Sequence, residues 1–153
     1  MGFGAVRFCC GSLLGFAGLI AVPCAIGQSA EGRLNGVFVL NEFLASPVAP
    51  QQEFVEYLYF GPDTTLTQWA IADARSQADV PPADGYVRSG DMLLMLPEGS
   101  TMDVPEATDS LHIFYISAWP SLNNGGDELY LIVGADTVSA HTYASSERGR
   151  SAE

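Results

Sequence analysis

The stretch NNGGDELYLIVGADTVSAHTY, residues 123–143, decides the fold because it is the clearest β-hairpin in the chain. It opens with a polar, glycine-containing loop at residues 123–128. Two segments follow in which apolar residues alternate with other residues, and the turn Gly134-Ala135-Asp136 separates them. Alternation with a period of two around a short turn is typical of two antiparallel strands. The apolar positions of the pattern are Leu129, Leu131, Val133, Val138, Ala140 and Tyr143.

Short runs of the same kind recur upstream of this hairpin. Along one of them Val55, Tyr57 and Tyr59 share a face, as they would on a half-buried strand. Residues 73–85 contain Pro81-Pro82 and predict an exposed loop. Seven strands without a convincing amphipathic helix predict an all-β, antiparallel β-sandwich in a single domain. The five upstream strands are expected at residues 36–45, 53–60, 66–72, 92–96 and 111–116.

The first 27 residues have the layout of a secretory signal peptide. Arg7 precedes an apolar stretch over residues 13–22, Pro23 breaks that stretch, and small residues follow. A retained membrane anchor is one alternative, but the apolar run counted from Phe8 to Val22, about 15 residues, is shorter than the ~20 that span a bilayer. Lipidation at Cys24 is another, although Pro23 stands where a lipoprotein signal has a small residue. The protein is therefore expected to be secreted, periplasmic or at the cell surface.

The sequence predicts that the chain has four parts. A signal peptide at residues 1–27 precedes a short linker at 28–35, a β-sandwich domain at 36–144 and a polar tail at 145–153 that is expected to fray. All three cysteines fall within the signal peptide, so the rest of the chain has no thiol for a disulfide or a metal site.

The chain is strongly acidic, with a formal net charge of −12. Without Arg7, the part that follows the signal peptide has five arginines against eighteen acidic residues, a net charge of −13. Such a surface repels phosphate groups and anionic lipid. Binding of nucleic acid is not expected, and neither is an integral membrane span after signal cleavage.

A series of short motifs also occurs in an order that resembles the lamin-tail domain of secreted bacterial proteins. The resemblance covers nearly all of residues 36–143. It implies an immunoglobulin-like β-sandwich that serves as an extracellular binding or interaction module. The motifs are Asn41-Glu42, Glu53-Phe54-Val55-Glu56 with Tyr59-Phe60-Gly61-Pro62-Asp63, Leu66 to Asp73 around Trp69, Ser89-Gly90-Asp91, and the hairpin from Leu122 to Tyr143.

Two acidic residues within apolar strands are the only candidates for catalysis. If Glu42 and Glu56 faced one cleft, they could act as the general acid and base of a small carbohydrate-active hydrolase or its accessory domain. The alternative is structural, because a buried carboxylate that accepts hydrogen bonds can fix a strand crossing. His112 and His141 are expected to be structural or surface residues, since no nucleophile motif accompanies them.

No cofactor is expected, although weak calcium binding remains open. Calcium takes several oxygen ligands, and two acidic loops could supply them. One contains Asp103, Glu106 and Asp109, and the other is residues 123–128. Neither follows the spacing of an EF-hand, so solvated acidic loops are the alternative.

The sequence therefore predicts a non-enzymatic binding module for an extracellular protein, a polysaccharide or a cell-envelope component. Trp69 is expected in the core, whereas Trp119 precedes Pro120 in a loop and is expected to be an exposed stacking residue. The predicted ligand-binding residues are Trp119, Asn123, Asn124 and Asp127. Self-association through edge strands in an envelope layer is a third possibility.

Overall fold

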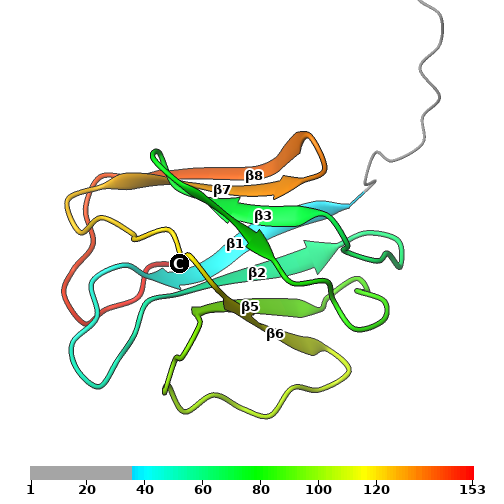
Figure 1. The fold of residues 1–153 in the computed structure, drawn as a ribbon, viewed down its shortest axis with the longest axis horizontal. Coiled ribbons are helices and arrows are strands. Elements are labelled where there is room, and N and C mark those ends of the chain that lie inside the picture. Colours follow the sequence, from blue (N-terminus) through cyan, green and yellow to red (C-terminus); the bar gives the residue numbers. More distant parts are fainter. Residues whose placement is uncertain (1–35) are drawn as a thin grey trace, which may run out of the picture. The chain divides into compact units, whose positions relative to one another are not determined.

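The computed structural model describes residues 36–153, which form two four-stranded sheets that enclose one apolar core (Figure 1). One sheet has the order β1-β2-β5-β6, and the other has the order β4-β3-β7-β8. The described residues contain no helix, which confirms the predicted all-β, immunoglobulin-like β-sandwich. The signal peptide and linker predicted for residues 1–35 lie outside the described residues. The strands are β1 (Val37–Leu44), β2 (Phe54–Phe60), β3 (Trp69–Ala72), β4 (Gln77–Val80), β5 (Met92–Pro97), β6 (Leu111–Ile116), β7 (Asp127–Val133) and β8 (Asp136–Tyr143).

The core lies where the predicted alternation places it. Val55, Tyr57 and Tyr59 of β2 are fully buried, whereas the residues between them are only partly so. Trp69 is buried, as predicted, and its ring meets Phe114 of the other sheet edge-on at 4.7 Å between ring centres. The period-two pattern therefore identifies the face of each strand that joins the two sheets.

Strand β4 occupies part of the segment that was predicted as an exposed loop. Asp73 forms the turn that precedes it: its Oδ1 accepts the backbone N–H of Arg75 at 2.7 Å and the hydroxyl of Ser76 at 3.0 Å. This turn reverses the chain so that Gln77–Val80 pairs with β3. Four residues are too few for a strong alternation signal, and the prolines that follow obscure it.

Strands β5 and β6 run parallel, so the prediction of a purely antiparallel sandwich is wrong for this pair. A parallel connection needs about a dozen residues to return along the sheet, usually in a helix. Residues 98–110 provide this length as a loop. The loop is held near its start, where the Thr101 N–H donates to Gln52 Oε1 at 3.0 Å.

The polar C-terminal tail is paired with β1, contrary to the expectation that it frays. Phe43 and Ala152 exchange two backbone hydrogen bonds of 3.0 and 2.9 Å. The Gly149 N–H also donates to the Ser46 carbonyl at 2.7 Å. The tail therefore extends the domain boundary beyond residue 144 and covers part of the free edge of β1.

Loss of the hydroxyl group is expected to affect the stability of the fold differently at the two buried tyrosines of β2. The Tyr59 hydroxyl donates to the Pro62 carbonyl at 2.7 Å. The Tyr57 hydroxyl lies beside Ser139 but completes no hydrogen bond, and burial raises its pKa. Urea denaturation should show that Tyr59→Phe costs about 1 kcal/mol, whereas Tyr57→Phe is neutral or stabilising. An equal loss in both variants would contradict this assignment.

Candidate binding groove beside strand β6

The loop at residues 123–128 is held together by Asp127. Its carboxylate accepts the backbone N–H of Asn123 at 3.2 Å, the backbone N–H of Glu128 at 2.9 Å and the side-chain amide of Asn123. Burial by itself would raise the pKa of Asp127, but these hydrogen bonds together lower it below its usual value. The Tyr143 hydroxyl donates to the Asn123 carbonyl at 3.0 Å. Asp127 was predicted to contact a ligand. In the structure, both of its carboxylate oxygens accept hydrogen bonds from its own loop.

Trp119 is half-buried against the core, so the prediction of an exposed stacking residue is wrong. Its indole N–H donates to Glu53 Oε2 at 2.7 Å. The Leu122 N–H reaches the same oxygen at 3.5 Å, which is the outer limit of a hydrogen bond. Burial raises the pKa of Glu53, although both donors oppose that effect. The pair connects the start of β2 to the segment that follows β6.

Two other predicted ligand contacts, Asn123 and Asn124, line a polar hollow of about 540 Å³. Glu53 and Arg148 lie in its walls, together with Ser46. Asn124 is exposed, whereas Asn123 is only partly so. The structure thus brings together Asn123 and Asn124, and connects Trp119 to them through Glu53, but the indole ring is not among the lining residues.

Glu42 and Glu56 lie directly opposite each other on β1 and β2. They share the face that points away from the core, and both are partly buried. Asn41 is the extra residue of a bulge in β1, and its side-chain amide donates to Glu56. Neither glutamate lines the polar hollow near Asn123, nor does either line the groove beside β6 or the hollow beside β3 and β4 that are described below. The geometry is that of a cross-strand pair rather than of two carboxylates that face across a cleft.

The acidic loops do not converge into a cation site. Among the described residues, no three His, Cys, Asp or Glu side chains come close enough to hold a metal ion together. Asp103, Glu106 and Asp109 are all exposed along the connection from β5 to β6. The predicted calcium ligands are therefore not assembled in this structure.

A groove of about 630 Å³ lies beside β6 and was not predicted from the sequence. Five consecutive residues of β6, Leu111–Tyr115, line one side. Residues from the segment 81–88, which follows β4, line the other side, and residues 107–109 complete it. The groove thus combines a strand with the residues directly before it and with a loop, residues 81–88, that is distant from it in the sequence.

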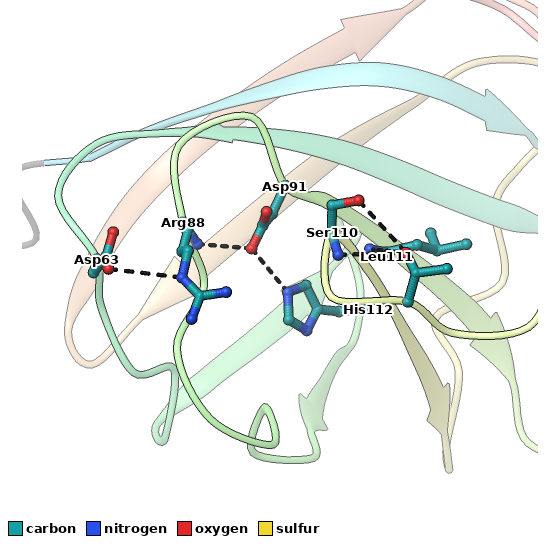
Figure 2. A network of polar contacts seen from close by, with 7 residues as sticks. Asp63, Arg88, Asp91, Ser110, Leu111 and His112 are labelled. Atoms are coloured by element: carbon teal, nitrogen blue, oxygen red, sulfur yellow. Dashed lines mark hydrogen bonds and ion pairs between the residues drawn. The ribbon is translucent and has the colours of Figure 1, made fainter.

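Polar contacts fix the strand and one loop of this groove in place (Figure 2). Asp91 Oδ2 accepts the backbone N–H of Arg88 at 2.7 Å and lies 3.0 Å from His112 Nε2. The Asp91 N–H in turn donates to the Arg88 carbonyl at 3.0 Å, and Gly90 has a positive φ of 94°, as the third position of a type II turn requires. Asp91 and His112 are both nearly buried. His112 is therefore a structural residue that joins β6 to the 88–91 turn.

Two exposed tyrosines line the groove. Tyr86 is 58% exposed, and Tyr115 is 46% exposed. A large aromatic ring that remains accessible beside a groove provides apolar contact area together with a polar hydroxyl group. Sequence reasoning missed both residues: Tyr86 lies in a proline- and glycine-containing loop, and Tyr115 occupies an alternating strand position that carries no sign of its exposure.

A second hollow, of about 590 Å³, adjoins this groove and shares Pro81 and Pro82 with it. It lies against β3 and β4, where Gln68, Gln77 and Asp79 supply polar groups. The buried Trp69 fixes their common wall, since its indole N–H donates to the Pro81 carbonyl at 2.9 Å. No exposed large aromatic residue lines this hollow among the described residues, so the groove beside β6 is the stronger candidate site.

The chain matches no protein-family model, and no curated protein matches it. Within residues 36–153 there is also no helix long and apolar enough to cross a membrane. The function is therefore argued from the groove and from the loops around it.

Proposed function

We propose that this protein is an extracellular binding module, a β-sandwich of the lamin-tail type whose ligand occupies the groove beside β6. The groove itself is the observation that carries the proposal. It has a volume of about 630 Å³, and two exposed tyrosines, Tyr86 and Tyr115, line it. Concave sites lined by aromatic rings and a few polar groups are the usual form of a binding site.

The titratable groups beside the groove support binding rather than chemistry. The Asp91 carboxylate accepts a backbone hydrogen bond from Arg88 and contacts His112, so both side chains hold the walls in position. Arg88 lies 3.7 Å from Asp63, and both side chains are more than half exposed, so this ion pair contributes little to stability. The groove is thus held in place by hydrogen bonds, and the charged residues at its rim form only a weak ion pair. This arrangement suits a site that binds its ligand without a chemical reaction.

An extracellular location is part of this proposal and rests on the predicted signal peptide at residues 1–27. The absence of cysteine from residues 28–153 is compatible with an oxidising compartment. Candidate ligands are an extracellular protein, a polysaccharide or a component of the cell envelope.

The test is retention of the full chain on immobilised extracellular polysaccharides and envelope fractions. Tyr86→Ala should weaken retention about fivefold, because one aromatic contact contributes roughly 1 kcal/mol. Phe60→Ala is the matched control, since Phe60 is 45% exposed but does not line the groove. Asn124→Ala examines the hollow near residues 123–124. Retention lost in Asn124→Ala and kept in Tyr86→Ala would move the binding site to that hollow.

A further inference from the structure

The groove follows the free edge of a β-sheet. Strand β6 is the last strand of its sheet and pairs only with β5. Its residues Leu111–Tyr115 line the groove without interruption, so the ligand site and the unpaired edge are the same place. Figure 1 shows β6 at the margin of the sheet, next to β5.

Two hydrogen bonds at the ends of the β5–β6 ladder establish which backbone groups face the groove. The Met92 N–H donates to the Ser110 carbonyl at 2.9 Å, and the Glu98 N–H donates to the Ile116 carbonyl at 2.9 Å. In a parallel pair, every second residue directs both backbone groups toward the same neighbour. The even-numbered residues of β6 therefore face β5, while Ile113 and Tyr115 present their N–H and C=O groups to the groove. No backbone hydrogen bond reaches these two residues from another segment of the described chain.

The other sheet edges are less available for pairing. The edge strands β1 and β8 pack against each other, with Phe43 and Tyr143 in ring contact at 4.8 Å, and β4 and β6 also lie close to each other. Strand β1 is also bulged at Asn41 and partly covered by the C-terminal tail. Strand β4 has only four residues. Strand β6 has the sequence LHIFYI, without proline, lysine or any acidic residue that would discourage pairing.

The charge of the site indicates the character of its occupant. Asp84 and Asp109 are exposed in the groove wall. Arg88 also lines the groove and lies 3.7 Å from Asp63, so three carboxylates surround this one arginine. The whole chain has a net charge of −12, so the field around the groove attracts cations. A segment with basic side chains is attracted to this negative potential, whereas an acidic segment is repelled.

We infer that the groove binds an extended, basic polypeptide segment of a partner protein, which adds to the sheet as a strand beside β6. This inference rests on the proposed binding function and names its ligand. The backbone of the segment pairs with Ile113 and Tyr115, and its alternate side chains contact the exposed tyrosine rings. At ~3.3 Å per residue, the groove-lining part of β6 accommodates about five residues of such a segment.

The direct test is binding of a peptide with three lysine-valine repeats to the full chain, followed by NMR. We expect the amide protons of Ile113 and Tyr115 to become protected from hydrogen exchange, while the amide of His112 changes little because it already faces β5. A peptide of the same sequence, N-methylated on the residues that pair with β6, should bind at least tenfold more weakly, since it cannot complete the added ladder. Equal binding of both peptides would overturn the inference.

Two variants at Tyr115 separate backbone pairing from side-chain contact. Tyr115→Pro removes an N–H that faces the groove and leaves the β5 ladder intact, so it should weaken peptide binding at least tenfold. Tyr115→Ala keeps the N–H and loses only the ring contact, so it should weaken peptide binding by no more than about fivefold. If Tyr115→Pro does not fold, the N-methylated peptide still decides the question.

The remaining outcomes identify other occupants. Retention of polysaccharide, lost in Tyr86→Ala and unaffected by the peptide, would keep the binding function but overturn the peptide inference. A concentration-dependent dimer that Tyr115→Pro abolishes would assign the edge to a second copy of this chain. If the chain bound no polysaccharide, no envelope fraction and no peptide, the proposed function would be overturned as well.

Discussion

Replacing Gly126 with alanine is expected to lower the free energy of unfolding by about 3 kcal/mol. Gly126 has a φ of +115°, a conformation that side-chain-bearing residues rarely adopt. A Cβ atom at this position would also lie 2.5 Å from the carbonyl oxygen of Ala144, which belongs to the backbone and cannot rotate away. The loop is anchored to the same segment, because the Ser146 N–H donates to the Asn124 carbonyl at 3.0 Å. Relief of the clash would therefore pull apart the contact between the loop and the chain after β8.

The neighbouring glycine provides a matched control for this prediction. A Cβ atom on Gly125 meets no atom within 4 Å, and its φ is not positive. Gly125→Ala should therefore change stability by less than about 0.5 kcal/mol. Urea denaturation followed by tryptophan fluorescence would compare the two variants with the parent chain. Similar stabilities for both would mean that the backbone of residues 123–126 does not require glycine at a defined position.

The sequence predicted most of the strands because their apolar residues either alternate, as in β2 and β7, or form short continuous runs between turns, as in β1 and β5. The pattern in β2 is a clear example, since Val55, Tyr57 and Tyr59 are all fully buried. Strand β4 was missed because Pro81 and Pro82 follow it directly and indicated a loop, and because the turn made by the Asp73 side chain carries no glycine or proline signal. The direction of β6 was missed because a parallel connection usually contains a helix, and residues 98–110 form a loop instead.

The candidate site was less predictable than the fold because its parts are distant in the sequence. The exposure of Trp119 depends on Glu53, which lies 66 residues away and accepts its indole hydrogen bond. The groove depends on the way the segment after β4 approaches the edge of β6. Local patterns carry information on which face of a strand is buried, but they do not show which loops meet at the end of a sandwich.

Replacing Asp127 with alanine is expected to cost about 3 kcal/mol of stability. The carboxylate accepts three hydrogen bonds, and its removal leaves the partly buried backbone N–H groups of Asn123 and Glu128 without their partner. Hydrogen bonds to a charged group contribute more than neutral ones, and an orphaned buried donor adds a further penalty. Asp103→Ala is the control, since Asp103 is exposed in a loop, and it should change stability by less than about 0.5 kcal/mol.

The lowered pKa of Asp127 gives this interaction a characteristic pH dependence. In the unfolded chain the group titrates near its ordinary value of about 3.9, and in the folded chain the hydrogen bonds hold its pKa below that value. Stability from the ionised form is therefore fully present above about pH 4 and decreases as the pH falls through the folded pKa. In Asp127→Asn this part of the acid dependence should disappear, because the side chain no longer titrates.

The stabilities of the parent chain, Asp127→Asn and Asp127→Ala, compared across pH 2–7, show whether Asp127 stabilises the loop through its charge or only through its volume. If Asp127 acts through its charge, the stabilities of the parent chain and Asp127→Asn should differ most at neutral pH and converge as the parent carboxylate is protonated. If it acts only through the volume it fills, Asp127→Asn should match the parent at every pH, and only Asp127→Ala should be weaker. Because Asp127 accepts three hydrogen bonds within its own loop, the first result would show that its charge stabilises that loop.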